Sequence, residues 1–281
     1  MPHPPFAPVE LSFQLSSGRF RAHSFGPESG RLTLCVHGLS ANSRSFDFLG
    51  EELANEGRRV VAIDLRGRGF SEITGLGTYG WRNHARDALE AATHLGAERF
   101  DYVGHSMGAF IGMEVARMAP ERVENLVLID AAGVPEAASL VPILAAIKRL
   151  GAVHADADAY LAKVKGLGTI SPWSPVWETH YRYDLVAAPG GVRSRTDHAA
   201  VLEDMAYAAT QHTRAFWPKL SMRTLLVRAG RPLGQGFIVS APDRAEFLVT
   251  APRGEAVDID ANHYTVMTHP RTVDAIRSFL S

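Results

Sequence analysis

A serine flanked by glycines is the strongest chemical signal in the sequence. Residues 104–108 read Gly-His-Ser-Met-Gly, directly after an apolar run and directly before residues with helical periodicity. The pattern Gly-x-Ser-x-Gly is typical of a sharp strand-to-helix turn that raises a serine hydroxyl above a sheet, and its glycines let strand and helix pack closely. We therefore predict that Ser106 is a nucleophile and that the backbone N–H of Met107, at the positive end of the helix, stabilises an oxyanion.

Two further motifs, together with the serine turn, resemble the α/β-hydrolase superfamily over essentially the whole chain. His37-Gly38 follows the apolar run 32–36, and residues 64–71 read Asp-Leu-Arg-Gly-Arg-Gly-Phe-Ser after the next apolar run. The resemblance implies a serine nucleophile and a helical cap, and it places a second oxyanion donor at the N–H of Leu39. The nearest resemblance is to the (acetamidomethylene)succinate hydrolase-like and esterase branch, which has a similar His-Gly-Leu loop.

The general base must be chosen among twelve histidines. In the family that resemblance indicates, the base follows the last strand near the C-terminus, and His263 lies there in the run Asp-Ala-Asn-His-Tyr. The rival is His269, whose place beside a proline is typical of a helix start. His37 precedes the nucleophile and is expected to support its loop, and His105 points the wrong way to accept the serine proton. We therefore predict His263 as the base.

The acid of the expected triad departs from the family's common pattern. Its usual position directly after the strand at 224–227 holds no carboxylate before Asp243. The residues around Asp243 read as a helix start in which the carboxylate of Asp243 satisfies free backbone donors. The alternative is Asp130, which ends the preceding strand beside the serine turn and matches the position used in the resembling branch. We predict Asp130 as the acid, with Asp243 as the alternative and Asp258 and Asp260 as minor candidates.

These residues predict hydrolysis of a small carboxylic ester, lactone or amide through an acyl-enzyme intermediate. The same groups serve C–C bond hydrolases and cofactor-free perhydrolases, because the pocket sets the chemistry. A non-catalytic ligand-binding receptor of the same fold is the alternative from another class, and burst kinetics with a chromogenic ester distinguish it. No metal site or complete dinucleotide motif is found in the sequence, so we expect no cofactor.

Alternation of short apolar runs with segments of helical periodicity indicates the scaffold. It predicts an α/β fold with a mostly parallel, doubly wound sheet of about eight strands, opening with an antiparallel hairpin. The predicted strands are 9–15, 19–24, 32–36, 60–63, 100–103, 126–129, 224–227 and 256–259. The predicted helices are 46–56, 81–95, 107–118, 242–249 and 271–280.

About 90 residues separate the strands at 126–129 and 224–227, which is too long for a loop. Residues 134–217 are therefore predicted to form a helical cap, and 1–133 with 218–281 to form the hydrolase core.

Within the predicted cap, aromatic side chains and two arginines are candidates for substrate binding. Trp173, Trp177 and Tyr181 fall in a segment expected to be irregular, where they would line a pocket or form the cap's own core. Arg193 and Arg195 lie in a glycine-rich loop, where they would hold a substrate carboxylate or remain solvated.

Composition narrows the partners. The chain has 281 residues, 46% of them hydrophobic and 21% charged, with a formal net charge of −1, which is ordinary for a globular protein and unfavourable for binding nucleic acid or an anionic membrane. The single cysteine, Cys35, is expected to be a buried strand thiol. The first five residues lack a signal-peptide pattern, so a cytoplasmic location is expected. A small-molecule substrate is the expected partner, and the oligomeric state is left open.

Overall fold

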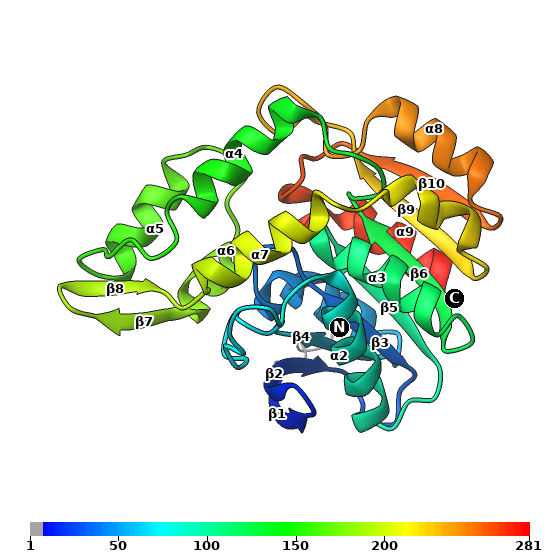
Figure 1. Cartoon of the computed structure of the whole chain (residues 1–281), viewed down its shortest axis with the longest axis horizontal. Helices are drawn as coiled ribbons and strands as arrows, with labels where there is room; N and C mark the ends of the chain where they lie inside the picture. Colours follow the sequence, from blue (N-terminus) through cyan, green and yellow to red (C-terminus); the bar gives the residue numbers. More distant parts are fainter. Residues whose placement is uncertain (1–7) are drawn as a thin grey trace, which may run out of the picture.

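The computed structural model describes residues 8–281, and an eight-stranded sheet forms its centre (Figure 1). The strand order is β1-β2-β4-β3-β5-β6-β9-β10. Strand β2 pairs antiparallel with β1 and with β4, while the remaining pairs are parallel. The fold class predicted from the sequence, with its antiparallel hairpin at one edge, is therefore confirmed.

The strands and helices follow one another in the expected alternation. The strands of the large sheet are β1 Val9–Leu15, β2 Gly18–Phe25, β3 Leu32–Val36, β4 Arg59–Ile63, β5 Phe100–His105, β6 Val123–Ile129, β9 Arg223–Ala229 and β10 Gly254–Ile259. The helices that flank it are α1 Asp47–Ala54, α2 Trp81–His94, α3 Met107–Met118, α8 Ala241–Thr250 and α9 Pro270–Leu280, with the short 3-10 helices η1 Ser43–Phe46, η2 Thr213–Lys219 and η3 Thr265–Thr268.

The central strands are buried on both faces. Every residue of β3 and of β5 is buried, as expected for parallel strands with helices on either side. Side chains of α2, α3 and α8 pack on one face of the sheet, and side chains of α1 and α9 pack on the other. Cys35 lies in β3 with no exposed surface, which confirms it as a buried strand thiol.

An insert separates β6 from β9. It contains α4 Ala137–Ile147, α5 Ala157–Lys165, α6 Pro175–Tyr183, the antiparallel hairpin of β7 Leu185–Ala188 and β8 Gly191–Ser194, and α7 His198–Ala208. Figure 1 shows most of these elements grouped at one end of the molecule, beyond the sheet.

The insert differs from the sequence prediction in two ways. It is not purely helical, because the glycine-rich stretch that was expected to be a loop turns sharply and pairs as β7 and β8. The aromatic segment that was expected to be irregular is largely the helix α6, begun by Pro175 at a position where a missing N–H costs no hydrogen bond. The limits predicted for the cap, 134–217, stay a prediction.

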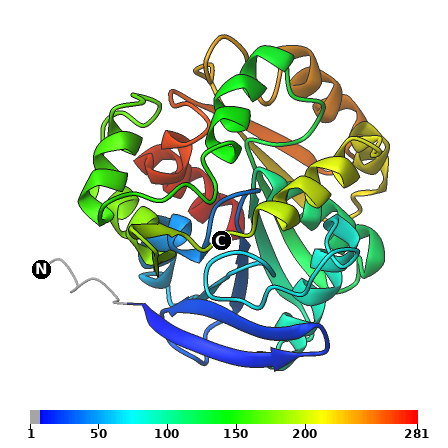
Figure 2. The same ribbon diagram turned by 60° about the vertical axis from the view of Figure 1, so that its left-hand side comes forward.

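Figure 2 shows the β1–β2 hairpin along one margin of the molecule and α8 on the far side. None of the helices in residues 8–281 is both long and apolar enough to span a bilayer. The expected absence of a signal peptide concerns the first five residues, which lie outside the described part of the chain, and the cytoplasmic location stays a prediction.

Candidate active site

Ser106 occupies a strained bend between β5 and α3. Its backbone lies at φ 55° and ψ −122°, in the left-handed half of φ space that few residues other than glycine adopt. The bend requires the neighbouring glycines, since a Cβ atom at Gly104 would overlap the carbonyl of Gly108, and one at Gly108 would overlap the carbonyl of Val36. The sequence thus forms a tight turn here because only glycine fits on either side of the serine.

The imidazole of His263 lies against the serine hydroxyl. Its Nε2 atom is 3.1 Å from Oγ of Ser106, and its Nδ1 atom is 2.9 Å from Oδ2 of Asp130. A neutral imidazole therefore donates Nδ1–H to the carboxylate and accepts the hydroxyl proton at Nε2. The side chain is buried, so these two contacts are made away from bulk water.

The loop after β10 holds His263 in this place. The side-chain oxygen of Asn262 accepts hydrogen bonds from the N–H groups of Tyr264 and Thr265, each at 3.0 Å, which closes the turn around the histidine. His105 donates from Nε2 to the carbonyl of His263 at 2.9 Å. Burial, with the nearby His263, lowers the pKa of His105 well below its usual value, so His105 is a neutral donor. It contacts the base and does not compete with it.

Asp130 is held from both sides by the end of β9. Its own N–H donates to the carbonyl of Val227 at 2.7 Å, and its Oδ1 atom accepts the N–H of Ala229 at 2.9 Å. The residue has a φ of 46°, a conformation that aspartate tolerates better than most side chains. With Oδ1 occupied by the backbone, Oδ2 is the oxygen that faces His263.

The rival acids are engaged elsewhere. Asp243 is buried and forms an ion pair with Arg214 at 2.7 Å, and its N–H donates to Oγ of Ser240, which caps α8. The expectation that the carboxylate of Asp243 caps this helix is wrong, because the serine does so. Asp258 and Asp260 each form ion pairs with arginines.

The rival base also has a structural place. His269 is the N-cap of α9, and its Nδ1 atom accepts the N–H of Arg271 at 3.2 Å. This agrees with the sequence prediction that His269 begins the last helix. Among the candidates weighed from the sequence, the structure therefore brings together Ser106, His263 and Asp130.

Two backbone N–H groups point to an oxyanion site beside the serine. Met107 begins α3, and Leu39 lines the same pocket as Ser106 and His263. Within residues 8–281, neither N–H has a hydrogen-bond acceptor. The loop of Leu39 lies close to the nucleophile, since a Cβ atom at Gly38 would be 3.0 Å from Cβ of Ser106. Glycine at that position lets the loop approach.

His37 supports this loop from behind. Its Nε2 atom accepts the N–H of Leu65 at 3.0 Å, so the ring proton is on Nδ1, which donates to the carbonyl of Gly38 at 2.8 Å. That carbonyl and the N–H of Leu39 belong to the same peptide group. Burial lowers the pKa of His37 to about 3, so the ring stays neutral and keeps this tautomer.

A pocket opens above Ser106 between the sheet and the insert. Trp177 and Tyr181 line this pocket, which is one of the two roles expected from the sequence. Trp173 does not line it and stacks on Tyr181, with 5.9 Å between the two ring centroids. Trp177 is almost fully buried and packs with the core side chains on the α1 and α9 face of the sheet. Lining the pocket therefore applies to Trp177 and Tyr181, and Trp177 also belongs to the core beneath the sheet rather than to a separate core of the cap.

The two arginines proposed from the sequence do not reach the pocket. Arg193 is exposed on β8, and Arg195 donates to the carbonyls of Gly69 and Ser71 and lies over the ring of Phe70. Strand pairing turns Arg193 outward and the loop after β4 binds Arg195, so their positions do not support the hypothesis that they hold a substrate carboxylate in this pocket.

Sequence reasoning missed the pocket's own charged residues. Arg149, just after α4, and Asp184, between α6 and β7, both line it, and Tyr264 beside the base lines it as well. No ion pair of Arg149 is formed within residues 8–281. Burial raises the pKa of Tyr264, and the charge of Arg149 opposes that shift. The signal for Arg149 in the sequence was a basic pair, Lys148 and Arg149, at the end of an apolar helix.

Comparisons with known proteins agree with this geometry. Residues 33–174, half of the chain, match the alpha/beta hydrolase fold family.

The chain belongs to the α/β-hydrolase family.

Among curated relatives of this α/β hydrolase, a serine hydrolase-like protein of Danio rerio is 35% identical over 45% of the chain and 39% of its own length. A 3-hydroxybutyrate-oligomer hydrolase of Cupriavidus necator is 33% identical over 48% of the chain and 44% of its own length. The chain thus spans less than half the length of these relatives. Among solved structures, E-2-(acetamidomethylene)succinate hydrolase is 23% identical with a TM-score of 0.86, covering 98% and 99% of the two chains, which shows that the two chains share the fold.

No cluster of three or more His, Cys, Asp or Glu side chains that could hold a metal ion occurs in residues 8–281.

Proposed function

We propose that this α/β hydrolase cleaves a small carboxylic ester through an acyl-enzyme intermediate on Ser106. The observation that carries the proposal is the continuous hydrogen-bonded chain from the Ser106 hydroxyl through His263 to Asp130. A serine hydroxyl is a weak nucleophile by itself and is activated when an adjacent base takes its proton. The name of the 3-hydroxybutyrate-oligomer hydrolase, which refers to an ester oligomer, supports an ester over an amide or lactone.

The proposed reaction begins when Oγ of Ser106 attacks the ester carbonyl and His263 takes the hydroxyl proton at Nε2. The carbonyl electron pair moves to oxygen, and the tetrahedral intermediate then expels the alcohol, which receives the proton from His263. Water, deprotonated by the same nitrogen, attacks the acyl-enzyme and releases the carboxylic acid and the serine. Asp130 stays ionised and stabilises the imidazolium at both stages.

The oxyanion of each tetrahedral intermediate would be held by the N–H groups of Leu39 and Met107. Both donors are part of the rigid backbone and are already free of other acceptors in the described chain, so no protein hydrogen bond must break when the charge develops. Removing one such donor typically costs about 3 kcal/mol of barrier stabilisation.

The pocket favours an ester that carries an acidic group. Arg149 lines the pocket, and within residues 8–281 its guanidinium donates one hydrogen bond, to the carbonyl of Ala145, which leaves most of its donors available. A guanidinium binds a carboxylate through two parallel hydrogen bonds. We therefore propose that Arg149, and not Arg193 or Arg195, binds a carboxylate of the substrate.

The nucleophile is tested by measuring p-nitrophenyl acetate hydrolysis with Ser106→Ala beside Ser43→Ala. Ser43 is a buried serine whose hydroxyl bonds to His23 and which does not line the pocket, so its replacement controls for the loss of a buried hydroxyl. We expect the burst of p-nitrophenol and steady turnover to vanish only in Ser106→Ala. Equal turnover by Ser106→Ala and wild type would overturn the proposal, and absence of both burst and steady turnover in wild type would favour a non-catalytic receptor.

The substrate class is tested with a p-nitrophenyl monoester of a dicarboxylic acid and a neutral ester of equal length. A hydrogen-bonded charge pair contributes about 1.5–3 kcal/mol, so Arg149→Met should raise KM for the acidic ester roughly 10- to 100-fold and leave the neutral ester within about three-fold. Arg193→Met is the control, because Arg193 is exposed and outside the pocket. An equal change for both esters would refute a role for Arg149 in binding the carboxylate.

A further inference from the structure

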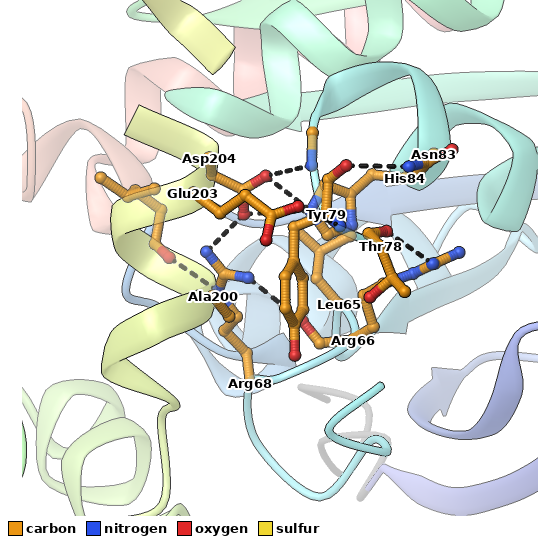
Figure 3. A network of polar contacts seen from close by, with 12 residues as sticks. Leu65, Arg66, Arg68, Thr78, Tyr79, Asn83, His84, Ala200, Glu203 and Asp204 are labelled. Atoms are coloured by element: carbon orange, nitrogen blue, oxygen red, sulfur yellow. Dashed lines mark hydrogen bonds and ion pairs between the residues drawn. The ribbon is translucent and has the colours of Figure 1, made fainter. Parts of the chain in front are cut away.

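Arg68 lies behind the candidate oxyanion site, in the loop after β4. Its side chain has no exposed surface, and it is among the largest fully buried side chains of the described chain. Figure 3 shows the side chain of Arg68 extending from this loop toward Asp204 on helix α7 of the insert. The proposed reaction assigns it no role.

The guanidinium of Arg68 makes three contacts with three different segments. Nε donates to the carbonyl of Leu39 at 2.9 Å, and Nη1 donates to the carbonyl of Arg66 at 3.1 Å. Nη2 lies 2.6 Å from Oδ2 of Asp204 on α7. One side chain therefore joins the candidate oxyanion loop to the insert.

Asp204 is itself tied to the core at a second point. Its Oδ1 atom accepts the N–H of Gly80 at 2.6 Å, and His84 on α2 lies 3.1 Å from both carboxylate oxygens (Figure 3). Burial opposes its charge, but His84 and Arg68 outweigh burial and lower the pKa of Asp204 to about 2. The carboxylate thus stays ionised at any pH at which the protein works.

The contact with Leu39 matters because of where that residue's N–H must point. The peptide group that carries this N–H is held on one side by His37, which donates to the carbonyl of Gly38. The next peptide group along the chain is held by Arg68 at the carbonyl of Leu39. With both flanking carbonyls bonded to buried donors, the orientation of the N–H between them is fixed, in a residue that lines the same pocket as Ser106. Stability alone does not explain why an arginine occupies this buried position, because a fully buried ion pair contributes little more to the free energy of unfolding than apolar side chains of similar size would.

We propose that Arg68 is a positioning residue that aligns the oxyanion donor of Leu39 and, through Asp204, couples this alignment to helix α7 of the insert. The inference rests on the proposed esterase function and adds that the catalytic rate depends on the position of α7 against the core. Removal of either partner should misdirect one oxyanion donor while the serine, the base and the acid stay in place.

The test compares Arg68→Met with Arg66→Met. Arg66 is in the same loop and is also buried, but its side chain pairs with Asp87 and donates to the carbonyl of Thr78, and within residues 8–281 it forms no hydrogen bond with Leu39 or α7. A misaligned oxyanion donor lowers kcat by up to about 100-fold, so we expect a 10- to 100-fold loss of kcat in Arg68→Met with KM within about three-fold of wild type. Arg66→Met should keep kcat within about three-fold.

An oxyanion mimic separates positioning from general loosening of the fold. The inhibition constant of a trifluoromethyl ketone, which forms a tetrahedral oxyanion on the serine, should rise by the same factor as kcat/KM falls, while the pH profile keeps its shape. If Arg68→Met does not fold, Arg68→Lys is measured instead. Lysine keeps the charge but loses the planar fork of donors, so kcat should also fall, but by a smaller factor. Wild-type kcat and inhibitor affinity in a folded Arg68 variant would refute the proposal.

The coupling to α7 is tested with Asp204→Asn, alone and combined with Arg68→Met. Two residues that act through one contact are not additive, so the double variant should be no slower than Arg68→Met. Multiplying losses would refute the coupling. Ser106→Ala distinguishes the two levels of the proposal: if it is inactive while Arg68→Met equals wild type, only this inference fails, and if it is active, the proposed function and this inference fail together.

Discussion

Replacing Asp130 by asparagine should reverse the tautomer of His263. The two carboxylate oxygens face two donors, the N–H of Ala229 at Oδ1 and Nδ1–H of His263 at Oδ2. Asparagine has only one oxygen. The backbone N–H cannot move its proton, so the amide oxygen will face Ala229 and the amide NH2 will face His263. The imidazole must then accept at Nδ1 and carry its proton on Nε2, where it cannot take the proton of Ser106.

The expected loss follows from this single proton. An aspartate-to-asparagine change that preserves geometry and inverts the tautomer of a catalytic histidine lowers kcat by about 10⁴. This corresponds to about 5 kcal/mol of barrier. The unfolding free energy should change far less, because the side chain keeps its shape and both hydrogen bonds.

The assay is steady-state hydrolysis of p-nitrophenyl acetate by Asp130→Asn and Asp243→Asn, with folding checked by circular dichroism. Asp243 is the matched control, because it is also buried but pairs with Arg214. ¹⁵N NMR of labelled histidine reports directly which nitrogen of His263 carries the proton. A proton found on Nδ1 in Asp130→Asn, or a kcat within ten-fold of wild type, would show that the reasoning is wrong. Loss of activity only in Asp243→Asn would transfer the acid's role to that residue.

Two further predictions concern stability. Burial, with a smaller contribution from Arg44, lowers the pKa of His180 to about 3, so between pH 4 and 6 the unfolded chain binds a proton there that the folded chain does not, and stability falls as pH falls. His180→Gln should therefore reduce the slope of unfolding free energy against pH by about 1.4 kcal/mol per pH unit, measured by urea denaturation, and an unchanged slope would contradict this. Gly108→Ala should lower the free energy of unfolding by more than about 3 kcal/mol, because the new Cβ would overlap a backbone carbonyl. Gly57→Ala should lower it by about 1 kcal/mol, because its Cβ would meet open space and only the positive φ is unfavourable. Equal losses of the two variants in thermal melts would refute the packing argument.

Local patterns in the sequence predicted most of the strands and helices of the scaffold. The apolar runs predicted the central strands β3, β4, β5 and β6, because a strand buried on both faces must be apolar along most of its length. The insert was harder, since β7 and β8 are short and only partly buried, and their pairing depends on a turn rather than on hydrophobic period. Its aromatic segment was misjudged because Pro175 reads as a break in a helix but in fact begins one.

By itself the sequence determined the serine turn and the loop of His263, because glycine spacing around a bend and order along the chain are properties of short stretches. Only the tertiary structure decided which carboxylate meets the imidazole and which arginine faces the pocket. Asp130 and Asp243 both lie near strand or helix ends, and the difference between them is that the backbone of Ala229 and the ring of His263 converge on one and Arg214 on the other. The convergence on Asp130 joins residues more than 90 positions apart, and it arises from packing that no local pattern records.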